Sequence, residues 1–126
     1  MVAVSDVTSA VHNPKGLDVA ALREHAAKGQ PLSTFTGGQE LPKEHIFGVD
    51  CDVLIPAALG GVITTDVVPR LQCKFLVEAA NAPTTYDADI ELRKRGIVVL
   101  PDIYTNAGGV TVSFFEWVQN LSHVIW

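Results

Sequence analysis

The sequence predicts an α/β fold in which a parallel sheet is covered by helices on both faces. The apolar runs are short, nearly continuous and rich in Val, Ile and Leu, which is typical of strands buried on both faces. Segments with helical periodicity follow these runs, and Gly and Pro separate strand from helix. Strands that alternate with helices along a chain indicate parallel pairing.

The first half of the chain is expected to form one strand and one helix. The strand is Val2–Val4, a β-branched run that ends in a Ser-Asp pair. The helix is expected over Leu17–Lys28, because apolar residues recur along it and a glycine follows it. The segment Gln30–His45 holds prolines and a glycine pair and is predicted to be a loop, with at most a short irregular strand near Thr34–Thr36.

The second half repeats the alternation three times. Threonines precede two of the predicted helices and are suited to cap them. The middle helix carries acids in its first turns and bases in its last, which complements the helix dipole. The expected strands are Cys51–Pro56, Lys74–Glu78 and Ile97–Leu100, and the expected helices are Thr64–Leu71, Tyr86–Arg95 and Val110–Leu121.

Composition indicates one globular domain. The chain has 126 residues, of which 48% are apolar and 18% are charged, below the usual charged share of about 25%. The formal charge is −5, and no basic run appears, which argues against nucleic acid as a partner. No apolar stretch approaches the roughly 20 residues of a membrane span, and the start lacks a signal-peptide pattern. We therefore expect a cytoplasmic protein with no membrane contact.

The cysteines and histidines do not suggest a metal site. Two cysteines in an ordinary globular composition are expected to be buried thiols in a reducing compartment, and neither has a ligand-type neighbour in sequence. None of the four histidines has a partner in a recognisable triad or metal spacing, and all are predicted to lie on the surface.

The segments that follow the predicted strands have the character of a cofactor crevice. Ligands of open parallel sheets bind beyond the carboxyl ends of the strands. These ends carry Asp6, the small residues of Ala57–Gly61, Asn81 and Asn106. Small residues allow a ligand to approach the backbone, and the acid and amides can hydrogen-bond to it. A nucleotide-binding α/β domain is the interpretation, although the fold alone does not name a reaction.

Each of these residues also has a purely structural interpretation. Asp6 could be an ordinary turn residue instead of a partner for a ribose hydroxyl, and Asn81 could simply cap its own turn. The two glycine pairs could serve only turn geometry. Ser113, one turn into the last predicted helix, could bond back to a helix carbonyl. The residues alone leave these alternatives open.

Five stretches resemble the glutamate dehydrogenase family in order and spacing. They are VAVSD, HNPKGLD, CDVLIPAALGGVIT, FLVEAANAPTT and LPDIYTNAGGVTVSFFEWVQN, and together they cover essentially the whole chain. The family also includes leucine, phenylalanine and valine dehydrogenases, and VTVSFFEW is more similar to the glutamate enzymes. The resemblance implies a Rossmann-like, doubly wound parallel sheet that lacks its first βα unit.

The resemblance also implies roles in coenzyme binding. Ser5 and Asp6 are expected at the adenosine ribose, which suits NAD, with NADP as the alternative. The family pattern places Asn81 beside the nicotinamide ribose and Asn106 near the nicotinamide amide. The dinucleotide is expected to be lined by Ala57, Ala58 and Leu59.

The implied substrate is glutamate, with 2-oxoglutarate as product. Val110 and Ser113 are expected to face it, with the Ser113 hydroxyl donating to its side-chain carboxylate. The parent enzyme is expected to be a homo-oligomer that deaminates L-glutamate oxidatively with NAD(P). Two other interpretations remain: a dehydrogenase for another amino acid, or a non-catalytic remnant or interaction module.

The sequence also departs from the family pattern. The glycine-rich phosphate loop, the substrate domain with its catalytic lysine and aspartate, and a further C-terminal helix are not found in it. Residues 1–126 are therefore interpreted as a partial dinucleotide-binding domain from within a longer enzyme, with no catalytic residue and no metal ligand. Alone, this chain is predicted to bind dinucleotide weakly and to catalyse nothing.

Overall fold

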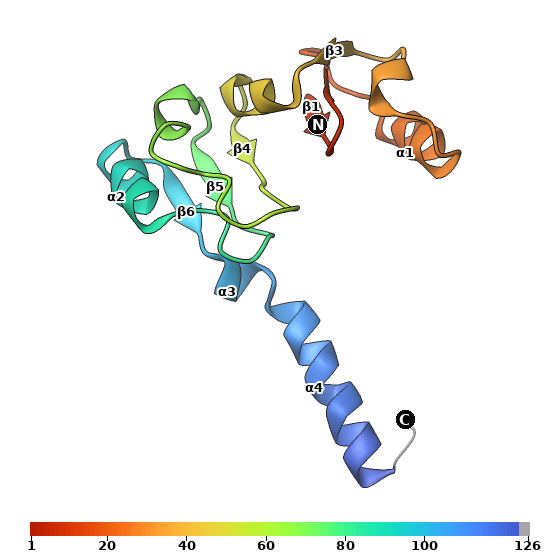
Figure 1. Ribbon diagram of the computed structural model, residues 1–126, viewed down its shortest axis with the longest axis vertical. Coiled ribbons are helices and arrows are strands. Elements are labelled where there is room, and N and C mark those ends of the chain that lie inside the picture. Colours follow the sequence, from red (N-terminus) through yellow and green to blue (C-terminus); the bar gives the residue numbers. More distant parts are fainter. Residues whose placement is uncertain (124–126) are drawn as a thin grey trace. The chain divides into compact units, whose positions relative to one another are not determined.

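The computed structural model describes residues 1–123 and divides into two compact units (Figure 1). Unit 1 comprises Met1–Cys51 together with Arg70–Gln72. Unit 2 comprises Asp52–Pro69 together with Cys73–Trp126. Each unit contains one three-stranded sheet, and the two sheets differ in strand direction.

The sheet of unit 1 is antiparallel. Its strands β1 (Ala3–Ser5), β2 (Ala10–His12) and β3 (Gln39–Leu41) lie in that order, with Val4 opposite Val11 and Val11 opposite Glu40. The prediction that the first strand joins a parallel sheet is therefore wrong. The reason is local, since residues 6–9 form a tight turn that folds β2 back beside β1. The prediction of a loop over Gln30–His45 is also wrong where β3 forms.

A small apolar core holds unit 1 together. Helix α1 (Val19–Ala27) begins after Asp18, whose carboxylate accepts a hydrogen bond of 3.0 Å from the backbone N–H of Ala21. The predicted helix is confirmed with slightly shorter bounds. The short helices η1 (Leu32–Thr34) and η2 (Lys43–Gly48) occupy the predicted loop region. The core consists of Val11, Leu17, Leu22 and Leu32, with Val4 and Phe35 packed against it.

The sheet of unit 2 is parallel, as predicted. Its strands are β4 (Val53–Leu54), β5 (Phe75–Val77) and β6 (Val98–Leu100), and β5 is central. The register aligns Leu54 with Leu76, and Leu76 with Val99. All three strands fall inside their predicted ranges. Their carboxyl ends therefore meet at one edge of the sheet, which fixes where the segments after them lie.

One face of this parallel sheet is more deeply buried than the other, although Leu54 and Val99, beside Leu76, are only half-buried. Leu76 in the central strand is 0% exposed. Helix α2 (Tyr86–Lys94), which lies beside β6, also contributes fully buried Ala88 and Leu92 (Figure 1). The Thr85 hydroxyl caps this helix by accepting from the Ala88 N–H, as the sequence predicts.

The other face of the parallel sheet is open in the structure. Val53, Phe75 and Val98 form one row across the three strands and are 46%, 42% and 52% exposed. The prediction of helices on both faces is therefore wrong for the residues that the structure describes. Strands of parallel sheets are rich in apolar residues because both faces are normally buried, so this row keeps the composition of a buried surface.

Two of the remaining predicted helices differ from the structure. The predicted helix Thr64–Leu71 is reduced to a short turn, η3 (Val68–Arg70), because Pro69 has no N–H to continue a helical ladder. The last helix begins earlier than predicted: α3 (Asp102–Thr105) is followed directly by α4 (Ala107–Ser122). The expected glycine loop is thus the first turn of a helix.

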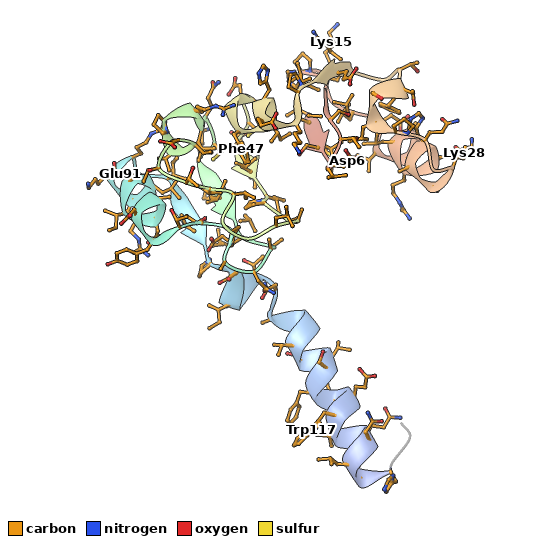
Figure 2. All side chains as sticks on the ribbon, in the orientation of Figure 1. Asp6, Lys15, Lys28, Phe47, Glu91 and Trp117 are labelled. Atoms are coloured by element: carbon orange, nitrogen blue, oxygen red, sulfur yellow. The ribbon has the colours of Figure 1, made fainter. Side chains whose placement is uncertain are left out.

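Helix α4 is apolar but not buried. Its side chains stand off the helix, as labelled Trp117 shows (Figure 2), and none of its residues is buried. The exposed apolar residues are Val110, Val112, Phe114, Phe115, Trp117 and Leu121. Among the described residues, no helix has the length and apolar character needed to cross a membrane.

The two cysteines are thiols and not a disulfide. Cys73 is buried, whereas Cys51 is only half-buried, so the expectation of two buried thiols holds for one of them. Burial raises the pKa of the Cys73 thiol, because a thiolate is poorly solvated in an apolar surrounding. Cys73 therefore behaves as a small apolar residue and not as a nucleophile.

Substituting Leu76 by Ala tests whether the buried face stabilises unit 2. We expect Leu76→Ala to lower the free energy of unfolding by about 2–5 kcal/mol, because it leaves a cavity beneath β5. Leu59→Ala is the matched control, since Leu59 is 71% exposed and the same change there should cost less than about 0.5 kcal/mol. Hydrogen exchange of the β5 amides measures both effects. Equal losses at the two positions would show that this face is not the core.

Candidate functional site at the carboxyl ends of the parallel strands

Backbone hydrogen bonds connect the segments that follow β4 and β5. The carbonyl of Pro56, after β4, accepts bonds from the N–H groups of Ala79 (3.1 Å) and Ala80 (2.9 Å), after β5. Glu78, at the end of β5, donates its N–H to the carbonyl of Leu100 in β6 (3.0 Å). The three strand ends are therefore held together by main-chain bonds, and the segments beyond them start from fixed positions.

Glycines allow the next residues to approach each other closely. Gly61 has a φ of +66° and donates its N–H to the carbonyl of Ala82 at 2.9 Å. A Cβ atom at Gly60 would lie 3.0 Å from the carbonyl oxygen of Asn81 and 3.3 Å from that of Ala82. The sequence pair Gly60-Gly61 therefore serves a close backbone contact between two strand-end segments as well as a turn.

Asn81 and Asn106, which the sequence singles out separately, are hydrogen-bonded to each other. The side-chain Nδ2 of Asn106 donates to Oδ1 of Asn81 at 2.8 Å, and it also approaches the carbonyl of Ala79 at 3.4 Å. The pair uses one donor and one acceptor on itself. The other two side-chain polar atoms of the pair, the donor Nδ2 of Asn81 and the acceptor Oδ1 of Asn106, do not take part in this mutual bond. Amides arranged in this way suit hydroxyl and carboxamide groups of a ligand.

Asp102 belongs to this site although the sequence did not single it out. Its carboxylate accepts hydrogen bonds from the N–H groups of Ala82 (2.7 Å) and Ile103 (2.6 Å). Its backbone carbonyl accepts from the N–H of Asn106 (2.9 Å). An acid directly after a strand and a proline, at the start of a helix, was the available signal, because such a residue is placed to bind main-chain N–H groups.

The proposed substrate residues lie on α4. Val110 is exposed, and the Ser113 hydroxyl donates to the carbonyl of Gly109 at 3.1 Å. This is the back-bonded arrangement that the sequence offered as the structural alternative for Ser113. The hydroxyl can rotate to another acceptor without moving the helix, so the bond does not prevent a role toward a ligand.

The residues expected to line the dinucleotide lie on the surface. Ala57, Ala58 and Leu59 follow β4 and are exposed. Two surface hollows lie away from these residues. One, in unit 1, is bordered by α1 and Phe35, and another, in unit 2, lies between η3 and α2. Neither includes a residue that the sequence assigns to coenzyme or substrate. The strand-end site is therefore an open surface formed by short backbone segments.

Ser5 and Asp6 lie in unit 1, at the turn between β1 and β2. The Asp6 carboxylate accepts bonds from the Thr8 N–H (2.8 Å), the Thr8 hydroxyl (2.6 Å) and the Ser9 N–H (3.1 Å). These bonds, that of the Thr8 hydroxyl above all, hold the pKa of Asp6 below its usual value. All three reach Oδ1, so the turn employs one carboxylate oxygen and orients the other. A turn role and a ligand role are thus compatible.

No group of three potential metal ligands gathers within residues 1–123, counting His, Cys, Asp and Glu side chains. The histidines that the sequence places on the surface are half-buried or exposed. His25, which is half-buried, lies within hydrogen-bond distance of the Pro31 carbonyl (2.9 Å) and the Thr34 hydroxyl (3.0 Å), where it fixes the end of α1 to η1. It has a structural role in unit 1.

Taken together, unit 2 is a parallel α/β sheet with small residues and amides at the carboxyl ends of its strands, the position at which such sheets bind ligands. The family model described as Glutamate/Leucine/Phenylalanine/Valine dehydrogenase matches residues 1–126. The chain belongs to this dehydrogenase family.

The relatives include glutamate dehydrogenases from several organisms. The chain is 45% identical over all of its 126 residues to glutamate dehydrogenase of Thermotoga maritima, and it spans 30% of that protein's length. The hetero-hexameric glutamate dehydrogenase of Thermus thermophilus, in its Leu-bound form, superposes with a TM-score of 0.82 at 34% identity, over 99% of this chain and 29% of that one.

A more distant structural match is a dehydrogenase named for a different amino acid. L-tryptophan dehydrogenase of Nostoc punctiforme matches with a TM-score of 0.60 at 26% identity, over 79% of this chain and 28% of that one. The resemblance that the motifs indicated is thereby confirmed at the level of the family and of its glutamate dehydrogenase members.

Titration tests the contribution of the Asp6 turn to stability. Because the folded pKa of Asp6 lies below the unfolded value of about 3.9, the carboxylate stabilises the fold above that value and loses this effect as the pH falls through the folded pKa. We expect Asp6→Asn to be less stable than the wild type at pH 7, by less than about 1 kcal/mol because the carboxylate is exposed. The difference should shrink progressively as the pH falls through the folded pKa, which thermal unfolding at several acidic pH values measures. A difference that persists in acid would exclude a role for the charge.

Replacing Gly60 tests the close contact between the strand-end segments. We expect Gly60→Ala to destabilise unit 2 by about 1–3 kcal/mol, because the new Cβ must displace the Asn81 carbonyl. Gly108→Ala is the control: no atom lies within 4 Å of a Cβ there, and Ala should stabilise α4 by up to about 1 kcal/mol. Hydrogen exchange of the β5 amides reports the first change. A neutral Gly60→Ala variant would contradict the packing described for this loop.

Proposed function

We propose that this chain forms the coenzyme-binding part of an NAD(P)-dependent glutamate dehydrogenase. The reaction is the oxidative deamination of L-glutamate to 2-oxoglutarate and ammonia. The observation that carries this proposal is the hydrogen-bonded pair of Asn81 and Asn106 at the carboxyl ends of the parallel strands, in a chain whose whole length matches the dehydrogenase family.

The strand-end residues fit a dinucleotide. Gly60 and the alanines after β4 leave the backbone accessible, and the asparagine pair offers one amide donor and one amide oxygen to a carboxamide or a ribose. Asp6, with Ser5, fits a ribose hydroxyl through the oxygen that its turn does not use, which favours NAD over NADP. The complete fold in which these parts act is proposed to be a Rossmann-like doubly wound sheet.

NAD(P) supplies the hydride acceptor, and the chain supplies binding and orientation. Asn81 and Asn106 fix the nicotinamide end, while Ala57, Ala58 and Leu59 cover the dinucleotide. Val110 and Ser113 face the amino acid, and the Ser113 hydroxyl turns from the Gly109 carbonyl to the side-chain carboxylate of glutamate. The lysine and aspartate that perform proton transfer in the family come from a substrate domain, so these 126 residues alone are catalytically inactive.

The compartment, assembly and partners of the parent enzyme are proposed from the same family relationship. The parent enzyme is proposed to be a cytoplasmic homo-oligomer without nucleic-acid or membrane partners. A related protein of Thermus thermophilus is described as a hetero-hexamer. The formal charge of −5 and the two thiols are consistent with this setting.

Another amino-acid substrate is the second candidate. The family includes leucine, phenylalanine and valine dehydrogenases, and one structural match is a tryptophan dehydrogenase. A hydroxyl at position 113 favours glutamate, because an apolar substrate side chain would leave that hydroxyl without a partner.

Coenzyme binding to the purified chain tests the proposal. We expect saturable but weak binding of NADH, weaker binding of NADPH, and no reduction of NAD in the presence of glutamate. Asp6→Ala should lower NADH affinity by about 10-fold, the loss of one hydrogen bond to a charged group. Asp50→Ala, at another exposed acid of unit 1, should leave it unchanged.

Titration calorimetry and NADH fluorescence supply the measurements. The absence of binding to either coenzyme would contradict the proposed function for this chain. Equal loss in Asp6→Ala and Asp50→Ala would contradict the role of Asp6. Glutamate-dependent reduction of NAD by the 126-residue chain would overturn the assignment of the catalytic residues to another domain.

A further inference from the structure

Asp102 connects the two asparagine segments of the strand-end site through two hydrogen bonds. Its Oδ2 accepts from the N–H of Ala82, which follows Asn81, at 2.7 Å. Its backbone carbonyl accepts from the N–H of Asn106 at 2.9 Å, across the single turn of α3. One residue therefore contacts the main chain next to both members of the pair. Its remaining oxygen, Oδ1, accepts from the Ile103 N–H at 2.6 Å.

The bond from Ala82 supports an unfavourable backbone conformation. Ala82 has a φ of +44°, in the left-handed region that is unfavourable for a residue with a Cβ atom. Its N–H is bound by Asp102, and its carbonyl accepts from the Gly61 N–H at 2.9 Å. The residue is thus held from both sides. The direction in which the chain leaves Asn81, and with it the Asn81 side chain, depends on this turn.

We propose that Asp102 is a positioning residue for the nicotinamide end of the coenzyme. It fixes the left-handed turn at Ala82 and the start of α4, and so brings Oδ1 of Asn81 within 2.8 Å of Nδ2 of Asn106. This inference rests on the proposed coenzyme function of the asparagine pair. In this role Asp102 acts through Asn81 and Asn106 and does not itself contact the ligand.

The chemistry at this position requires a carboxylate. Two N–H groups point at the two oxygens of Asp102, and both oxygens can accept at once. An asparagine of the same shape has one acceptor oxygen, and its NH₂ group would face the second N–H. Asp102→Asn must therefore lose one of the two bonds and turn a donor toward a donor, while the volume of the side chain stays the same.

The first test needs no ligand. In ¹⁵N NMR spectra, we expect Asp102→Asn to shift the side-chain amide signals of Asn81 and Asn106, and to speed the exchange of the Ala82 amide proton. Asp87→Asn is the matched control, since it makes the same change at an exposed acid in the first turn of α2. Unchanged asparagine signals in Asp102→Asn would overturn the proposal whatever the chain binds.

The second test separates positioning from a general loss of structure. NADH and ADP share the adenosine and diphosphate parts, but ADP lacks both the nicotinamide and the ribose that carries it. We expect Asp102→Asn to weaken NADH binding by about 10-fold, the effect of one charge-assisted hydrogen bond, and ADP binding by less than about 2-fold. Equal weakening of both ligands would show a merely structural role and overturn the proposal.

The two tests also distinguish this inference from the proposed function. If the wild-type chain binds neither NADH nor ADP, the proposed function fails, and the coenzyme role of Asp102 fails with it. The amide signals then still decide whether Asp102 holds the asparagine pair. If the wild type binds both ligands and Asp102→Asn binds both with wild-type affinity, the proposed function stands and the role of Asp102 is overturned.

Discussion

The parallel pairing of β5 with β4 and β6 is the constraint on which the site depends. Parallel strands send all their carboxyl ends to one edge of the sheet, so three segments distant in sequence must meet there. Main-chain bonds from Ala79 and Ala80 to Pro56 then fix two of these segments to each other. The side-chain contact between Asn81 and Asn106 is a consequence of this convergence, since the two residues are 25 positions apart.

The sequence predicted the parallel part of the fold well because its signals are local. The strands β4, β5 and β6, the N-cap Thr85 and helix α2 each follow from a short stretch of residues. The hairpin of β1 and β2 was missed because a Ser-Asp pair after an apolar run is equally compatible with a strand end at a ligand crevice and with a tight turn. The two interpretations are distinguished only by the hydrogen-bond partners of the Asp6 carboxylate, Thr8 and Ser9, which lie outside the first strand.

The residues of the candidate site were likewise only partly predictable from the sequence. Asn81 and Asn106 could be chosen from the sequence because each follows a predicted parallel strand, where ligands of such sheets bind. Their specific roles came from the family resemblance and remain proposals. Asp102 has a local signal as an acid at the start of a helix, but the sequence does not show what it binds, because its role depends on the conformation of Ala82, and a positive φ at an alanine has no sequence signature. Such a position is specified by the contacts that surround it and not by the residue itself.

The open face of the parallel sheet shows how a local pattern can be correct while a tertiary conclusion from it is wrong. The apolar residues of β4, β5 and β6 alternate between a buried row through Leu76 and an exposed row through Phe75. Their composition is that of strands covered on both sides, which was the basis for predicting two layers of helices.

Helix α4 carries a second exposed apolar surface, including Phe114 and Trp117. Residues of this kind stabilise a fold only when they leave water, at about 25 cal/mol for each Å². Within residues 52–123, the sheet of unit 2 therefore buries its apolar residues mainly on one face, whereas the strand-end site is held by hydrogen bonds along one edge. Stability and the proposed coenzyme binding would thus depend on different surfaces of the same three strands.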